Sequence, residues 1–355
     1  MRHTGTRSTA TLFVLAFGYF ACYVPYSATT KALTSRAVRG EDVVDGLVLL
    51  PVMTLASLVA MISTVTLLGW WPYATPPGAR WPRPTRWTLL SGIATATILV
   101  TTTLAYTFDG VSLTFVMLVM RGGVLVLAPV VDMLTGRRIR WFSWLALALS
   151  LASLANAVAT RDGAVPLLCA IDLALYLAGY FVRLRLMARL GKSDDVAVRR
   201  RYFVEEQLVA SPAAVALLAV LALVGPAAIR EPLRDGFALW TEPTAGWAIL
   251  AGMCSQGTGV FGGLLLLDAS ETSYCVPLNR ASSILGGVGA AVALAWMFHV
   301  PGPTHGELIG ALVLVVAVAV LWIGPRVARI GQPRAATLPL PRAVGRARRR
   351  RSSAA

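Results

Sequence analysis

The chain has 355 residues, of which 56% are hydrophobic and only 14% are charged, and its formal net charge is +15. A soluble domain of this length needs a much larger charged surface. The composition therefore excludes a soluble globular protein and predicts an integral membrane protein, for which the bilayer is the main solvent.

Ten apolar stretches follow one another along the chain. Each approaches the roughly 20 residues that a helix needs to cross the hydrocarbon core of a bilayer. The first follows Arg2 and Arg7, as in a signal peptide, but it is too long for one and leads directly to the next stretch, so we interpret it as a retained helix. The predicted fold is an all-α polytopic membrane protein with ten transmembrane helices. They are predicted over residues 11–30, 43–69, 88–106, 111–131, 141–160, 164–187, 203–224, 246–267, 272–297 and 306–324.

The connections between these stretches are mostly short and leave no room for a folded soluble domain. Residues 1–10 are predicted to form a cytoplasmic N-terminus and residues 325–355 a basic, disordered cytoplasmic tail. Between them, residues 11–160 and 161–324 are predicted to form two five-helix repeats.

Basic residues gather on one side of this ten-helix topology. Of the 32 Lys and Arg residues, 24 lie on one side and 6 on the other. The positive-inside rule makes the richer side cytoplasmic, so both termini are predicted to be cytoplasmic. The Arg- and Ala-rich composition is typical of a GC-rich bacterial genome, and the expected location is the plasma membrane, which is the inner membrane of a bacterium.

The C-terminal tail ends in a cluster of arginines among Pro, Ala and Ser. Such a cluster attracts anionic lipid headgroups, at about 1 kcal/mol per basic residue near the surface. The simpler interpretation is a solvated segment that only fixes the topology. No aromatic residues are interleaved with the charges and no binding module accompanies them, so nucleic acid is not an expected partner. A homodimer is left open.

Two of the 32 basic residues, Arg121 and Arg280, fall inside apolar stretches. An arginine near the bilayer centre costs about 2.5 to 3.5 kcal/mol on insertion scales, so each is expected to face an interior cavity or a partner. A structural pairing with carbonyls or a carboxylate is one interpretation, and a role in substrate binding is the other.

The segments around these arginines match each other without a gap. DGVSLTFVMLVMRGG begins at Asp109, and DASETSYCVPLNRAS begins at Asp268, with a constant offset of 159 residues. A weaker match pairs the segments around Tyr26 and Tyr180. Because five predicted helices, an odd number, separate the matched segments, the two halves are expected to be inverted relative to each other, with a site near the midplane. The two aspartates precede their helices and are expected to cap them.

Other polar residues inside the predicted helices complete the candidate site. Asp172 is interpreted as the only carboxylate well inside a helix, and it is expected either to pair with an arginine or to carry a coupling proton. Helix-to-helix hydrogen bonding is the simpler role for each of the uncharged residues. The candidate substrate-binding residues are Arg121, Arg280, Tyr26, Tyr180, Tyr274 and Asn279.

No cofactor or metal is expected. All four cysteines fall inside predicted helices without paired spacing, so neither a disulfide framework nor a zinc site is predicted. The three histidines lie at the N-terminus, at His3, or beside one connection, at His299 and His305. No constellation typical of a membrane-embedded enzyme appears, and the chain is not expected to be one.

Two longer segments carry a resemblance to a known family. Residues 121–158 read RGGVLVLAPVVDMLTGRRIRWFSWLALALSLASLANAV, and residues 279–320 begin NRASSILGGVGAAVALAW. They resemble the fourth and fifth, and the ninth and tenth, helices of the drug/metabolite transporter superfamily, including its EamA-type permeases. In the nucleotide-sugar and triose-phosphate branches, basic residues on the fourth and ninth helices bind substrate phosphate. The resemblance implies that Arg121 and Arg280 clamp an anion.

The function predicted from these observations is secondary transport of a small anionic metabolite by alternating access. The alternatives are a membrane receptor, sensor or scaffold without transport, and less plausibly a membrane-embedded enzyme. Flux of a solute into liposomes separates the classes, because a receptor only binds the solute and an enzyme changes it.

Overall fold

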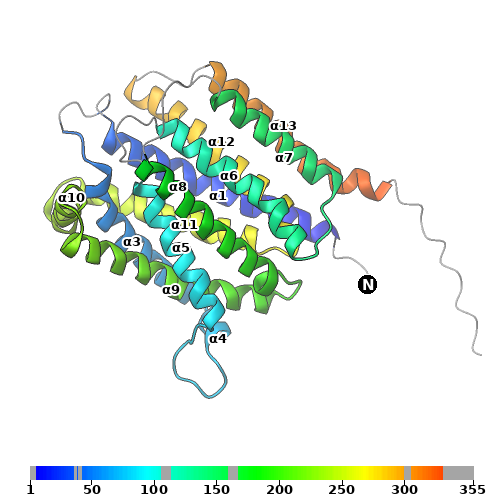
Figure 1. The fold of residues 1–355 in the computed structure, drawn as a ribbon, viewed down its shortest axis with the longest axis horizontal. Coiled ribbons are helices and arrows are strands. Elements are labelled where there is room, and N and C mark those ends of the chain that lie inside the picture. The colour runs from blue at the N-terminus through cyan, green and yellow to red at the C-terminus, as the bar shows by residue number, and fades with distance from the viewer. Residues whose placement is uncertain are drawn as a thin grey trace, which may run out of the picture.

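The computed structural model describes residues 5–35, 38, 42–104, 113–158, 167–299 and 305–330, and among these residues it has helices and connections but no strand. Ten helices in these ranges have 18 residues or more (Figure 1). They are α1 (Gly5–Thr34), α3 (Gly46–Leu67), α5 (Arg86–Leu104), α6 (Leu113–Leu134), α7 (Trp141–Val158), α8 (Leu167–Leu186), α9 (Val196–Val224), α11 (Ala245–Leu266), α12 (Thr272–Phe298) and α13 (His305–Ile330).

Six of the described helices are long and apolar enough to cross a membrane. They are α1, α3, α9, α11, α12 and α13. Helix α8 carries Asp172, Arg183 and Arg185 in addition to its apolar residues. The described residues therefore support a multi-pass membrane protein, while ten crossing helices stay a prediction.

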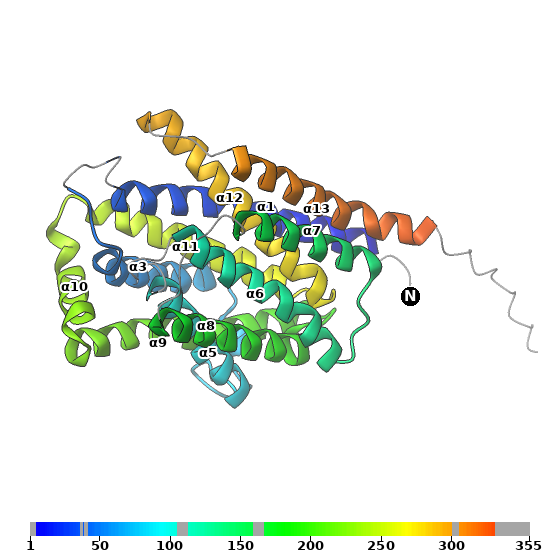
Figure 2. The ribbon, with the colours of Figure 1, turned by 45° about the horizontal axis from the view of Figure 1, so that its top comes forward.

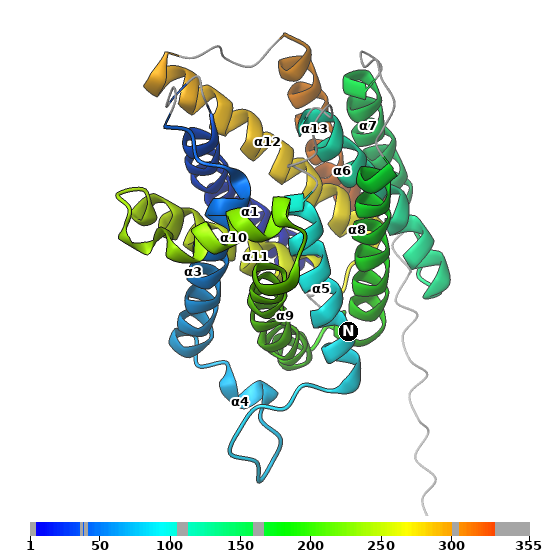
Figure 3. The same cartoon turned by 60° about the vertical axis from the view of Figure 1, so that its left-hand side comes forward.

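The helices pack across the two predicted halves. Helix α1 lies against α11 and α12, and α8 lies against α5 and α6. Helix α3 packs on α11, and α9 lies between α3 and α5 (Figure 3). Helices α7 and α13 run side by side along one edge of the bundle (Figure 1). The main hydrophobic core is shared by both halves, since it includes Leu125 and Phe142 from the first and Leu184 and Leu265 from the second.

Two shorter helices join the long ones. Helix α4 (Trp71–Ala74) follows α3, and the amphipathic helix α10 (Ala227–Ala238) follows α9. Helix α10 runs across one end of the bundle (Figure 2) and buries Leu233. A side chain at Gly236 would come within 2.4 Å of the Val48 carbonyl oxygen, so glycine is what allows α10 to approach α3. The sequence did not predict α10, because twelve residues with charges on one face give no apolar stretch.

The predicted capping by aspartate needs a correction. Asp268 does not cap α12, because Glu271 is the N-cap residue and the Asp268 carboxylate accepts from the backbone and hydroxyl of Ser270 instead. Asp268 also forms an ion pair of 3.3 Å with Arg199. The free amides of α12 bind Asp132, which belongs to α6. Asp109 lies outside the described residues.

Candidate functional site

Arg121 on α6 and Arg280 on α12 are both buried, with 8% and 7% of their surfaces exposed. At a rise of 1.5 Å per residue, each lies about 12 Å along its helix from the first residue. Helices α6 and α12 contact each other. One guanidinium from each predicted half is thus held in the interior of the bundle, as the sequence predicted.

A tyrosine holds each arginine. Arg280 donates from its Nη2 to the hydroxyl of Tyr180 on α8 at 2.8 Å, and its guanidinium carbon lies 4.9 Å from the centre of that ring. Arg121 donates in the same way to the hydroxyl of Tyr23 on α1, with its guanidinium carbon 5.4 Å from the ring centre. Each pair therefore combines a charge-assisted hydrogen bond with a cation–π contact.

Further tyrosines connect these two pairs. Tyr19 stacks on Tyr23 with ring centres 5.7 Å apart, and it lies within electrostatic reach of both arginines. Tyr26 meets Tyr23 edge to face at 5.7 Å, and Tyr176 lies 4.9 Å from Tyr180. These residues form one group around the two guanidinium groups, which we call the arginine–tyrosine cluster. It comprises Tyr19, Tyr23, Tyr26, Arg121, Tyr176, Tyr180 and Arg280.

The sequence predicted only part of this cluster. It paired Tyr26 with Tyr180, whereas the structure shows that Tyr23 is the tyrosine bonded to Arg121. Tyr19 and Tyr176 were missed as well. A usable signal was present, because residues spaced by three or four lie on one face of a helix. Tyr19, Tyr23 and Tyr26 have this spacing on α1, as do Tyr176 and Tyr180 on α8.

No carboxylate among the described residues forms an ion pair with Arg280 within 4.0 Å. Its Nε is buried and has no hydrogen-bond partner there. Asn279, the residue before it, is buried too, and its amide lies 3.0 Å from where a Cβ on Gly262 would stand. The same glycine faces the ring of Tyr19. The cluster is therefore positively charged at Arg280, with an amide close by.

Asp172 is buried on α8, but among the described residues it forms no ion pair with either arginine within 4.0 Å. Its Oδ2 has no hydrogen-bond partner in that part of the chain. Asp172 shares a helix face with Tyr176 and Tyr180 because the three are spaced by four residues. Of the two roles predicted for Asp172, the static pairing is not seen.

Tyr274 is not part of the arginine–tyrosine cluster. Its hydroxyl donates to the Leu321 carbonyl at 3.0 Å, and its ring lies 5.3 Å from the Arg140 guanidinium carbon. These partners keep it in the first turn of α12, away from Arg280. Its role in substrate binding stays a prediction that no contact with the arginine–tyrosine cluster supports.

Asp172 is also not the only carboxylate deep inside a helix. Glu205 and Glu206 on α9 are fully buried, and Asp132 is buried in the last turn of α6. Helix α9 begins at Val196, earlier than the predicted start at residue 203. The earlier start places both glutamates between about two and a half and three turns into the helix. The prediction of a single buried carboxylate is therefore wrong.

Glu206 forms a buried ion pair with Arg183. The Arg183 Nε and Nη2 each donate to one carboxylate oxygen at 3.0 Å. The Ser91 hydroxyl donates to the same carboxylate at 2.6 Å. Arg183 follows Tyr180 by about one turn of α8, so this pair lies next to the arginine–tyrosine cluster. The sequence counted Arg183 among the basic residues of the cytoplasmic side, at the end of the helix predicted over residues 164–187, and the structure buries it.

Comparison with known proteins bears on the fold and the membrane assignment. Profiles of known protein families give no match. A crystal structure of a protein with 14% sequence identity superposes with a TM-score of 0.53, covering 91% of this chain and 99% of that one. At this identity the likeness shows the fold alone.

A similarity to a curated protein shows a family. A UPF0060 membrane protein of Clavibacter sepedonicus is 32% identical over 113 residues, which are 31% of this chain and 88% of that protein. The relative is named a membrane protein, in agreement with the apolar helices described above. Over the matched third of its length, the chain belongs to the family of the UPF0060 membrane proteins.

Proposed function

We propose that this protein is a secondary transporter that moves a small anionic metabolite across the membrane by alternating access. The observation that carries the proposal is the arginine–tyrosine cluster, to which each predicted half contributes one buried arginine held by a tyrosine. Transporters built from inverted repeats place their substrate site near the midplane, where the repeats meet.

The helix contacts support the inverted repeat and, with it, the drug/metabolite transporter architecture. If the first half is laid on the second, α1 corresponds to α8, α5 to α11 and α6 to α12. The contacts of α1 with α11 and α12 then correspond to those of α8 with α5 and α6, which are also observed. The bond from Arg121 to Tyr23 likewise corresponds to that from Arg280 to Tyr180.

The charge of the cluster favours an anion. Guanidinium groups bind carboxylate and phosphate through two parallel hydrogen bonds, and the buried Nε of Arg280 is available for one of them. The Tyr180 hydroxyl orients Arg280 without neutralising it. A solute with a carboxylate or phosphate headgroup would supply the missing negative charge.

Purified protein in liposomes tests the proposal. A panel of carboxylates and phosphates is first screened for thermal stabilisation of the protein, and the stabilising solutes are then tested for uptake. Arg121→Gln and Arg280→Gln are expected to abolish uptake while the protein stays folded, and Lys at either position is expected to keep part of it. Arg230→Gln on α10 is the matched control and is expected to behave as wild type. Wild-type uptake by both Gln variants would refute the site, and binding without flux would indicate a receptor.

The orientation forms part of the proposal. The basic side of the topology is assigned to the cytoplasm, with both termini there. Reporter fusions at the connections and at the C-terminus test this assignment. A C-terminus outside the cell, or an odd number of crossings, would contradict it.

A further inference from the structure

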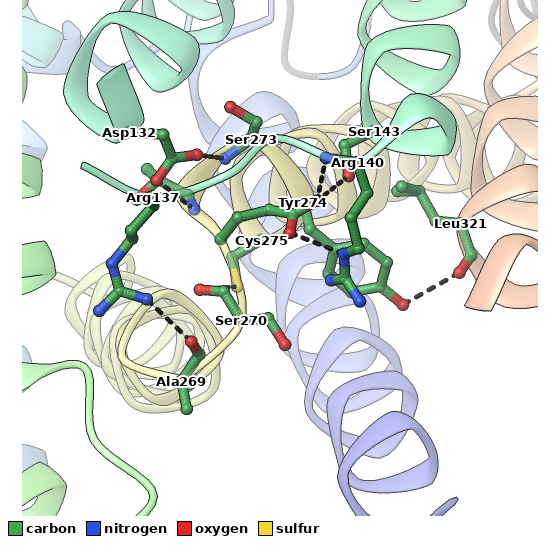
Figure 4. A network of polar contacts seen from close by, with 12 residues as sticks. Asp132, Arg137, Arg140, Ser143, Ala269, Ser270, Ser273, Tyr274, Cys275 and Leu321 are labelled. Atoms are coloured by element: carbon green, nitrogen blue, oxygen red, sulfur yellow. Dashed lines mark hydrogen bonds and ion pairs between the residues drawn. The ribbon is translucent and has the colours of Figure 1, made fainter. Parts of the chain in front are cut away.

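One end of the bundle carries a dense polar network. Here the connections 135–140, 187–195 and 267–271 meet, at the end opposite α10 (Figure 2), and we call this the basic end. The Asp132 carboxylate of α6 accepts from the backbone amides of Thr272 and Ser273 at 2.9 and 2.6 Å. It thereby binds the free N-terminus of α12, where amides and helix dipole both favour an anion. Figure 4 shows this contact in its surroundings.

A second carboxylate makes a similar link in the other direction. Glu271, just before α12, accepts from the Arg140 Nε at 2.6 Å and from the Arg140 backbone amide at 3.2 Å. The Ser143 hydroxyl of α7 donates to the same carboxylate. Glu271 is nearly fully buried, while Arg140 stays partly exposed. Glu271 thus binds the start of α7, and Asp132 binds the start of α12.

Cations complete the network by binding backbone carbonyls. Arg137 donates to the carbonyls of Ala269 and Ala188 at 2.8 and 3.1 Å (Figure 4). Lys192 donates to the carbonyls of Asp268 and Ser270 at 3.0 and 2.7 Å. Arg137 belongs to the first half and its acceptors to the second. Separating the halves at this end would therefore break several charge-assisted hydrogen bonds at once.

The two carboxylates of this network are not repeated in the sequence. Under the offset of 159 residues that relates the two halves, Glu271 corresponds to Ser112 and Asp132 to Ala291. Arg140 corresponds to His299. Neither carboxylate has an acidic counterpart at the offset position, so the sequence does not repeat these two links.

We propose that the network of Asp132 and Glu271 is a gate that keeps the empty protein closed at the basic end. This inference rests on the proposed function, because a gate has meaning only for alternating access. The network stabilises one of the two arrangements of the halves, so the empty protein opens more readily at the end near α10. Solute binding must offset the loss of these bonds before the basic end opens.

Two native cysteines report on this gate. Cys275 is fully buried in the first turn of α12, and its sulfur lies 3.4 Å from Lys192 Nζ. Opening the basic end would expose it. Cys169 is equally buried but lies at the start of α8, at the opposite end of the bundle. A local opening exposes only the first of these thiols, whereas unfolding exposes both.

The test measures labelling by a polar maleimide in two single-cysteine proteins that keep either Cys275 or Cys169, with the other three cysteines changed to Ser. Glu271→Gln replaces one carboxylate oxygen, which accepts hydrogen bonds from Arg140 and Ser143, by an amide NH2 group, which donates. The substitution is expected to speed Cys275 labelling by about tenfold or more. Arg140→Gln, which removes the partner, must show the same pattern. Cys169 labelling is expected not to rise above its wild-type rate, because opening of the basic end does not expose it. Glu231→Gln, at an exposed acid of α10, is the matched control and is expected to change neither rate.

Unchanged Cys275 labelling in both gate variants would overturn the proposal. Faster labelling of both cysteines would also overturn it, because the network would then hold the fold and not a gate. The measurement needs no transported solute. A protein with the expected labelling but no flux would disprove transport alone, and a protein with flux but unchanged labelling would disprove the gate alone.

Discussion

The buried pair of Arg183 and Glu206 allows a quantitative test of the structure. Glu206→Gln keeps the size of the side chain and removes its charge. The guanidinium of Arg183 would then stay in the interior without its counter-ion, and one of its two 3.0 Å hydrogen bonds would face an amide donor. Removing one partner of a buried ion pair costs about 3–5 kcal/mol, because the other charge remains desolvated.

The neighbouring acid is a matched control on the same helix. Glu205 is as buried as Glu206, but its partner Arg201 is 55% exposed and can turn towards water. Glu205→Gln also keeps an oxygen that can accept from the Thr88 hydroxyl, which now donates at 2.8 Å. Its expected cost is only about 1–2 kcal/mol. The difference between the two variants thus isolates the burial of the cation.

Equilibrium unfolding of the purified variants in mixed micelles, followed by tryptophan fluorescence, measures both losses. Replacing both members of the pair, Arg183→Met with Glu206→Leu, is expected to recover most of the loss, because no unpaired charge remains. A Glu206→Gln variant no less stable than Glu205→Gln would refute the reasoning. So would a double variant less stable than Glu206→Gln alone.

Three further predictions concern the cluster and the tail. A Cβ at Gly286 would lie 2.8 Å from the Tyr23 ring, whereas nothing lies within 4 Å of one at Gly287. Gly286→Ala is therefore expected to reduce uptake and to cost about 1–3 kcal/mol of stability, whereas Gly287→Ala is expected to change neither. Equal effects of the two substitutions in uptake and unfolding assays would contradict the packing described. Asp172→Asn removes a proton-binding group that has no ion pair among the described residues. Uptake by this variant is expected to lose any stimulation by a proton gradient, and the free energy of unfolding is expected to stay unchanged. A less stable variant would instead indicate that Asp172 is a static counter-ion. Removing residues 331–355 is expected to weaken sedimentation of the protein with anionic vesicles at low salt and to leave uptake unchanged. If the truncated protein sediments as the full chain does, the tail has a topological role only.

Much of the helical fold could be predicted because its signal is local. A helix that crosses a bilayer must satisfy its own backbone and show an apolar surface, so the length of an apolar stretch is enough to locate it. The ten long helices accordingly fall close to the ten predicted stretches. Arg121 and Arg280 were found for the opposite reason, because a charge inside an apolar stretch is costly.

The predictions failed where the decisive contact is distant in sequence. The basic run before Tyr202 looked like a solvated connection, and nothing local showed that α9 continues through it and buries Glu205 and Glu206. Glu206 is stable there because Arg183 and Ser91 come from other helices. The choice of Tyr23 over Tyr26 likewise depends on how α1 is rotated against α6. The sequence shows which residue types are present, but only the packing of the helices determines which of them form pairs.

The partners of the two buried arginines bear on how such a site would work. A carboxylate beside each guanidinium would offset the charge fully, as Glu206 does for Arg183, and an anionic solute would then have to displace it. A tyrosine binds the guanidinium by its hydroxyl and its ring, yet carries no charge. Arg280 in the cluster is bonded to Tyr180 and forms no ion pair with a described carboxylate within 4.0 Å, while Arg183 is bonded to a carboxylate outside the cluster. This division keeps positive charge at Arg280, where a solute would bind, and neutralises it at Arg183, where only the fold depends on it.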